Sequence, residues 1–450
     1  MNNVVPISTA IVPLREVQAE FALLNLGGEI RVVSLAEIEA TLNGTREGSI
    51  SMYKTADGKL LIMRFIETLA VSSKPAHVVE EFKHSPHTRV YDALAFSPLP
   101  TPAATLNFWV GSTVVPSKGD WSVIRDYLQE VVCDGDLKKF EYLLNFVAHM
   151  LQHPDKKPGV MLVLLGGEGT GKGTLFQLLN ALWTRTSLLV SNIDDVVGQF
   201  NAAIERKFII FMDEAMFSGD RKAQDRLKSM ITEATVTVEQ KYQPSRTIAS
   251  YHRFIAASNH QHFAQVSSDD RRFLFLRVSE QRKKDYAYWA KVHRAIEDPL
   301  VISALAYDLS TRDLTDFNIR DRPGTVEHME QKLRSLTGFE RYWFEVLHDG
   351  SFGSDNNPRI ILPWSGPCFV ATAALVGGYK GDARGVQKYQ SFQQQDVGRS
   401  LLKICPSAMV ARRQVDGRQQ RGFELPSLSA ARAEFAAAMG GDVDWGDQDG

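Results

Sequence analysis

The hydrophobic pattern indicates short strands at the start of the chain and helices after them. In the first 100 residues, short apolar runs alternate with turn signals such as Asn43-Gly44 and Asp57-Gly58, which predicts small strands and hairpins. The apolar runs cover residues 21–26, 30–33 and 60–65. From Trp121 onward, apolar residues recur every three or four positions up to Pro154, which predicts two helices. We therefore expect a small α+β region at 1–105 and a helical segment at 106–157.

The remainder of the chain predicts an α/β core followed by helices and a small mixed domain. Strand-like and helix-like segments alternate over residues 158–285, which is typical of a parallel sheet with flanking helices. Helical periodicity returns at 286–309 and 326–347, so a helical block is expected at 286–349. A mixed domain should fill 350–439, and the acidic, glycine-rich residues 440–450 should form a frayed tail.

A glycine-rich loop follows the apolar run 160–165 and precedes an apolar helical pattern. The loop consists of Gly166, Gly167, Glu168, Gly169, Thr170, Gly171, Lys172, Gly173 and Thr174. Between a buried strand and a helix, such a loop predicts a phosphate site: backbone N–H groups surround a polyphosphate and Lys172 reaches its terminal phosphates. A structural glycine turn is the alternative. Gly173 stands where Ser or Thr usually follows the lysine, so Thr174 is the hydroxyl expected near Mg²⁺.

Two further apolar runs end in polar side chains suited to hydrolysis. Residues 208–212 lead into Asp213 and Glu214. We expect Asp213 to hold Mg²⁺ through its water shell and Glu214 to polarise the attacking water, although an isolated acidic pair more often caps a helix. Residues 254–257 lead to Ser258 and Asn259. Asn259 either orients the water or senses the γ-phosphate at the carboxyl edge of the sheet, or is a turn residue.

Two adjacent arginines, Arg271 and Arg272, precede the apolar run 273–276. They form either a surface ion pair or an arginine finger offered to the nucleotide of a neighbouring subunit. Arg272 is the preferred finger because it lies directly before the predicted strand, which fixes its position.

Charge and cysteine usage exclude several classes of protein. The 51 Lys and Arg residues balance 53 Asp and Glu residues, so any contact with a polyanion must be local. Basic residues cluster at Lys241, Arg246 and Arg253, at 271–284 and at 403–421, where solvated faces are the alternative reading. The three cysteines are far apart, which fits a reducing cytoplasm and indicates neither a disulfide framework nor a zinc site. Because no apolar run reaches about 18 residues, no membrane partner is expected.

The order of these motifs resembles that of the superfamily 3 helicases of phages, plasmids and small DNA viruses, and within them the helicase part of phage primase-helicases. In that family, a β-hairpin between the second and third motifs ends in a lysine that binds single-stranded DNA in the channel of a ring. Here Lys241, Tyr242 and Arg246 match this motif. The resemblance covers about residues 90–435 and is most specific at 160–280.

The resemblance implies a AAA+-like P-loop core at 158–285, preceded by a helical collar at 106–157 and followed by a winged-helix-like domain at 350–439. It also implies ATP and Mg²⁺ as cofactors, a homo-oligomer of six subunits, and single-stranded DNA as the partner in the bacterial host cytoplasm. Family members often carry a primase-polymerase with paired aspartates, and the first 100 residues show no such pair. We therefore expect a separate primase or polymerase as a further partner.

Two other functions remain open at this point. The loop also resembles that of adenylate-type nucleotide kinases, although the Asp-Glu pair and the two arginines are unlike them. An initiator or loader that uses ATP only as an assembly switch is the second alternative. It would bind origin duplex through Lys403, Arg412, Arg413, Arg418 and Arg421.

Overall fold

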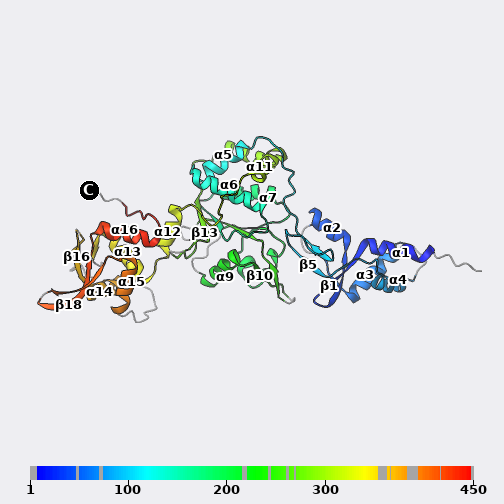
Figure 1. Ribbon diagram of the computed structural model, residues 1–450. Helices are drawn as coiled ribbons and strands as arrows, with labels where there is room; N and C mark the ends of the chain where they lie inside the picture. The colour runs from blue at the N-terminus through cyan, green and yellow to red at the C-terminus, as the bar shows by residue number, and fades with distance from the viewer. Residues whose placement is uncertain are drawn as a thin grey trace, which may run out of the picture.

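The computed structural model arranges the chain as three bodies in a row, with the N-terminal body at one end and the C-terminal body at the other (Figure 1). The residues that it describes are 8–46, 50–69, 74–214, 220–241, 245–259, 263–267, 270–352, 362–364, 366–382, 394–415 and 417–446. Each body has its own buried apolar cluster, and the central body has one on each face of its sheet.

The N-terminal body is a small sheet with four helices around it. Its elements are α1 (Ser8–Glu20), β1 (Phe21–Leu26), β2 (Glu29–Ser34), α2 (Leu35–Asn43), β3 (Tyr53–Lys54), α3 (Thr55–Thr68), α4 (Pro75–His84) and β4 (Val90–Tyr91). The sheet has the order β3-β2-β1-β4. A parallel pair, β5 (Ala93–Ala95) and β6 (Thr105–Asn107), leads to the central body. The predicted hairpin of the first two apolar runs is confirmed by β1 and β2.

The strand predicted at residues 60–65 is wrong, because this run lies inside α3. Ile62 and Ile66, one helical turn apart, are its buried side chains, and a continuous apolar run does not reveal this spacing. Gly58 lies in the first turn of α3, where a Cβ would stand 2.5 Å from Val32 on β2. The glycine therefore permits close packing of helix on sheet and does not form a hairpin turn. Gly44, in the left-handed conformation, ends α2.

The central body is built on a parallel sheet of five strands, which confirms the predicted α/β class. The strands are β7 (Met161–Leu165), β8 (Ser187–Val190), β9 (Ile209–Met212), β12 (Arg253–Ser258) and β13 (Phe273–Arg277). Their order is β13-β7-β12-β9-β8, and every neighbouring pair is parallel. Along β7, Leu162 and Leu164 face one apolar cluster while Met161 and Val163 face the other, as expected for a sheet covered on both sides.

Helices cover the two faces of this sheet unequally. One face carries α5 (Ser122–Asp126), the π-helix η1 (Tyr127–Val132), α6 (Leu137–Gln152), α7 (Lys172–Leu182), α10 (Tyr286–Glu297) and α11 (Pro299–Thr311). The other carries α8 (Asp194–Val197), the 3₁₀ turn η2 (Ala202–Ile204), α9 (Arg221–Thr232) and the hairpin β10 (Thr235–Val238) and β11 (Arg246–Ala249). Figure 1 shows α5, α6 and α11 on one side of the sheet and α9 with β10 on the opposite side. The helices predicted between Trp121 and Pro154 are thus present.

The C-terminal body combines helices with a three-stranded antiparallel sheet of order β16-β18-β17. Its elements are α12 (Val326–Ser335), α13 (Gly338–Asp349), β14 (Ser351–Phe352), β15 (Leu362–Pro363), β16 (Cys368–Ala371), α14 (Thr372–Asp382), α15 (Gln394–Ile404), β17 (Met409–Val415), β18 (Arg418–Leu425) and α16 (Leu428–Met439). The helical pattern at 326–347 is broken into α12 and α13 at Leu336 and Thr337.

Part of the predicted frayed tail is packed. Trp445 lies against Phe344 and Phe435, with ring centroids 5.8 and 5.9 Å away, and the Arg432 guanidinium lies 5.1 Å from its ring. Val443 is also buried. Because the segment is acidic overall, its composition did not indicate that Val443 and Trp445 would be packed. Within the described residues, no helix combines the length and the apolar character that crossing a membrane requires.

Candidate nucleotide site

The glycine-rich loop connects β7 to α7 and depends on glycine at defined positions. Gly169 and Gly171 have φ angles of +72° and +95°, which side chains with a Cβ rarely adopt. A Cβ on Gly171 would lie 2.1 Å from the Trp289 ring, and one on Gly167 would lie 2.8 Å from a carboxylate oxygen of Glu280. The loop is therefore shaped by close neighbours as well as by its own backbone.

The Lys172 ammonium group lies at the centre of this loop. Its Nζ donates to the carbonyl oxygens of Gly166 at 2.7 Å and Gly167 at 2.6 Å, and to Asn259 Oδ1 at 2.6 Å. Burial lowers the pKa of Lys172, while the carboxylate of Asp213 acts in the opposite direction. To reach a phosphate, the ammonium must exchange these acceptors for phosphate oxygens, which are stronger partners because they are charged.

No side chain caps the amino end of α7. Asp136, Asp220 and Asp285 accept first-turn N–H groups at α6, α9 and α10, whereas Gly171 at the start of α7 offers no such cap. The Tyr127 hydroxyl donates to the Gly171 carbonyl oxygen at 2.9 Å and so holds the loop to the π-helix η1. First-turn N–H groups without a side-chain cap, next to a buried cation, make a suitable site for a polyphosphate.

Three polar side chains that follow neighbouring strands act on Lys172: Asn259 accepts from its Nζ, and the carboxylates of Asp213 and Glu214 favour its charged form. Asn259 follows β12, which pairs with β7 on one side and with β9 on the other. Asp213 and Glu214 follow β9 directly, and the Glu214 N–H donates to Asp213 Oδ1 at 3.0 Å. Glu214 has a φ of +52°, an uncommon conformation for a residue with a side chain. Glu214 is exposed, whereas Asp213 is half-buried.

Thr174 and Gly173 differ in exposure. Thr174 is only 6 % exposed, whereas Gly173 is exposed and a Cβ added there would meet no atom within 4 Å. In the first turn of α7, the exposed position is therefore Gly173, which has no hydroxyl group. The described residues hold no group of three or more His, Cys, Asp or Glu side chains that could bind a metal ion by themselves. The glycine cradle, Lys172 and Asp213 suit Mg²⁺ that arrives bound to a nucleotide.

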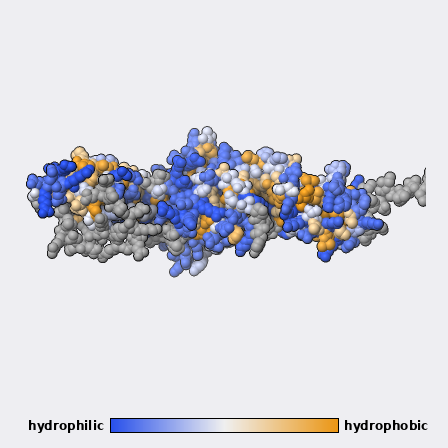
Figure 2. Space-filling model, turned by 90° about the horizontal axis from the view of Figure 1, so that it is seen from below, coloured by the Kyte–Doolittle hydropathy of each residue, from blue (hydrophilic) through white to orange (hydrophobic). Residues whose placement is uncertain are grey.

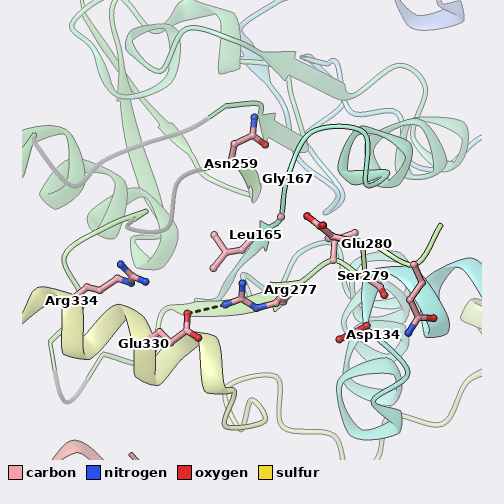
Figure 3. A pocket seen from close by; sticks show the side chains of 12 residues that line it. Asp134, Leu165, Gly167, Asn259, Arg277, Ser279, Glu280, Glu330 and Arg334 are labelled. Carbon is pink, nitrogen blue, oxygen red and sulfur yellow. Dashed lines mark hydrogen bonds and ion pairs between the residues drawn. The ribbon is translucent and has the colours of Figure 1, made fainter. Parts of the chain in front are cut away.

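A cavity of about 630 Å³ adjoins the loop and includes residues that the sequence interpretation missed. Figure 3 shows Gly167 and Asn259 on one side of it and Arg277, Glu330 and Arg334 on the other. Arg277, the last residue of β13, forms an ion pair with Glu330 at 2.8 Å. A signal for Arg277 existed, since it follows a predicted strand at the carboxyl edge; Arg334 on α12 gives none.

The structure does not bring Arg271 and Arg272 to this cavity. They lie before β13, at the amino edge of the sheet, and the Arg272 carbonyl accepts from Met161 N–H at the start of β7. The five residue pairs between β13 and β7 separate the two edges by roughly 13 Å at about 3.3 Å per residue. The Arg272 backbone N–H donates to Asp270 Oδ1 at 2.9 Å, and its guanidinium lies 4.0 Å from the same carboxylate.

The predicted DNA-binding residues have different surroundings. Lys241 is exposed at the end of the β10–β11 hairpin, with Nζ 5.4 Å from the Phe200 ring, whereas Tyr242 lies outside the described residues. Arg246 forms an ion pair with Glu205 at 3.0 Å. Arg253, which the sequence grouped with them, is fully buried and donates to the carbonyl oxygens of His153, Pro154 and Lys156. Its role is structural, so only Lys241 is an exposed cation of this cluster.

Comparisons with known proteins agree with this fold. Residues 164–272 match a family described as "Family of unknown function (DUF5906)". Over 166 residues, 36% of this chain, the sequence is 30% identical to the DNA primase-polymerase of Nitratiruptor phage NrS-1, and the match spans 22% of that protein. Two apo structures of the NrS-1 C-terminal region have TM-scores of 0.63 and 0.62, each with 15% identity and with 94% of this chain and 100% of the other covered.

Proposed function

We propose that this chain is an ATP-dependent, ring-forming DNA helicase of the superfamily 3 type that acts in phage or prophage DNA replication. The observation that carries the proposal is the convergence of Lys172, Asn259 and the Asp213–Glu214 pair at the carboxyl edge of one parallel sheet. Ligands of open α/β sheets bind at this edge. The relationship to a phage primase-polymerase supports the replication setting.

Each group at this edge has a distinct role in the proposal. With ATP as substrate, water would attack the γ-phosphorus, the bond to the bridging oxygen would break, and ADP and phosphate would be released. The loop N–H groups and Lys172 would hold the phosphates, and Asp213 would hold Mg²⁺, which neutralises charge on them. Glu214 takes the proton of the attacking water, and Asn259, released by Lys172, orients that water. Thr174, which is as buried as Lys172, remains with Asp213 a proposed partner of the metal.

The ring follows in this proposal from the position of Arg272. Because this arginine lies at the amino edge, roughly 13 Å from the loop edge of its own sheet, it is suited to the nucleotide of a neighbouring copy. A hexamer is the assembly that we propose, with the AAA+-like body at 158–285 as its ATPase core. The exposed Lys241 on the β10–β11 hairpin is then the contact to single-stranded DNA in the channel.

We also propose a fold class for the C-terminal body and a source for the primers. The antiparallel sheet β16-β18-β17 with α14 and α15 supports a winged-helix-like C-terminal domain. Priming is assigned to a separate primase or polymerase in the host cytoplasm.

The test is the rate of ATP hydrolysis with and without single-stranded DNA, together with unwinding of a forked duplex. A helicase is stimulated by the strand and separates the fork. A nucleotide kinase would instead require a nucleoside monophosphate. The helicase proposal would be refuted if single-stranded DNA does not change the rate of ATP hydrolysis and the forked duplex stays intact at saturating ATP.

One observation favours a second candidate, an ATP-switched initiator or loader that binds duplex DNA. Arg412 and Arg421 stand opposite each other on the β17–β18 ribbon, and both are exposed. Like charges in register destabilise a ribbon, so a polyanion would relieve this pair. Figure 2 shows the outermost tip of this end of the molecule as hydrophilic, with apolar atoms beside it. Tight duplex binding that the double change Arg412→Gln/Arg421→Gln removes, in a protein that does not unwind, would favour the loader.

A further inference from the structure

A second cavity, of about 670 Å³, lies where the N-terminal body meets the amino edge of the central sheet. The end of α2 forms one wall, and the turns that precede β8 and β9 form the opposite wall. Arg185 joins the two walls, because its guanidinium donates to the Leu42 carbonyl oxygen and packs against Gly44. The cavity is therefore closed by the N-terminal body, to which the sequence interpretation gave no site.

The lining of this cavity is strongly basic. Four cations, Arg46, Arg185, Arg206 and Lys207, line it together with one carboxylate, Glu205. That carboxylate is already paired with Arg246, as described above. Arg46 is in turn paired with Glu37, so the excess of positive charge in the lining comes from Arg185, Arg206 and Lys207, in a protein whose overall charge is close to balanced.

Two buried polar atoms of this lining have no hydrogen-bond partner among the described residues: Arg206 Nη1 and Thr186 Oγ1. The Arg206 guanidinium lies 3.7 Å from the ring of Phe108, and burial lowers its pKa. A buried guanidinium with an unsatisfied N–H destabilises the protein unless an anion enters.

We propose that this cavity binds the phosphate backbone of single-stranded DNA and that the N-terminal body serves as its outer wall. This inference rests on the proposed function. The cavity reaches the DNA-binding hairpin, since Gln240 lines it and Lys241 follows. Phe200, whose ring lies 5.4 Å from the Lys241 ammonium group and which is 47 % exposed, offers a ring on which a base can stack beside the hairpin. A strand that leaves the hairpin would thus meet cations and an aromatic ring along one path.

The decisive experiment compares two substitutions at the cavity rim. Thr184 lines the cavity and is exposed, so Thr184→Glu adds a negative charge without removing a contact of the fold, and Thr184→Gln is the neutral control of the same size. With labelled oligo-dT at low salt, Thr184→Glu should raise the Kd on the order of tenfold relative to Thr184→Gln. Arg206→Gln should lower the salt dependence of log K by about 0.7, the value for one lost phosphate contact.

Arg64→Gln serves as the control for Arg206→Gln, because Arg64 is an exposed arginine on α3 and does not line this cavity. Equal affinities of the two Thr184 variants, while Lys241→Ala still weakens binding, would overturn the cavity site and leave the helicase proposal intact. A wild-type chain that does not bind oligo-dT would overturn both. Tight binding of thymidine monophosphate at the cavity, with oligo-dT unaffected by Thr184→Glu, would replace the strand with a mononucleotide.

Discussion

The two edges of the central sheet differ in the charge that they offer. The carboxyl edge holds one buried cation, Lys172, beside the carboxylates of Asp213 and Glu214. The amino edge holds arginines: Arg271 and Arg272 before β13, and Arg206 before β9. A polyphosphate with its metal suits the first edge. In the function that we propose, Lys172 and Arg272 of two neighbouring copies share one nucleotide site, whereas Arg206 belongs to a cavity that lies within one copy.

The largest effect should follow from changing the carboxyl edge. Lys172→Ala should reduce ATP hydrolysis to background, because no other cation of the loop can neutralise the β- and γ-phosphates. Phosphate release by the purified variant is the measurement, and Lys222→Ala, on the exposed surface of α9, is the control. Turnover at the wild-type rate would remove the phosphate-loop assignment.

The next largest effect should come from the amino edge. Arg272→Ala should still bind ATP but lose on the order of 10³-fold or more in turnover, as expected for an arginine finger. Arg271→Ala, one residue earlier and exposed, is the matched control. Melting temperatures of both variants reveal whether losing the contact of the Arg272 guanidinium with the Asp270 carboxylate unfolds the chain.

Mixing the inactive Arg272→Ala and Lys172→Ala chains sharpens the comparison of the two edges. Some interfaces then combine an intact loop with an intact arginine, so part of the activity should return. Mixed rings that form and stay inactive would mean that the arginine acts within its own subunit or only on structure.

Substitutions of the two carboxylates, Glu214 and Asp213, should have a smaller effect, and the two variants should differ in nucleotide binding. Glu214→Gln should keep nucleotide binding and slow hydrolysis about 10²-fold or more, because an amide cannot accept the proton. Asp213→Asn should weaken Mg²⁺-dependent nucleotide binding as well. Titration of a fluorescent nucleotide with and without Mg²⁺ separates the variants; identical curves would show that the division of roles is wrong.

The smallest effect on basal turnover is expected at the hairpin. Lys241→Ala should leave hydrolysis without DNA nearly unchanged while stimulation by single-stranded DNA and unwinding are lost, since this lysine touches the strand and not the nucleotide. Lys291→Ala, exposed on α10 at the opposite face of the sheet, is the control. Unwinding at the normal rate would make Lys241 an ordinary surface lysine.

The carboxyl edge could be predicted from sequence because each of its motifs is local. In each motif, an apolar run that forms the strand is followed within two residues by the residues of the candidate site, which are the glycines, Asp213 or Asn259. The basic cavity could not be predicted, because Arg46, Phe108, Arg185 and Arg206 come from four segments that share no spacing. Ion pairing and burial also escaped prediction, since Arg246 and Arg253 look alike in sequence and have different partners in space.

The contact between Gly171 and Trp289 gives the molecule a built-in optical probe. The indole ring lies against the loop residue that precedes Lys172, and its Nε1 donates to the Arg282 carbonyl oxygen at 2.9 Å. Trp289 belongs to α10, so its ring contacts the loop from a separate element. Occupancy of the site can therefore be followed in unlabelled protein through the emission of one of its seven tryptophans.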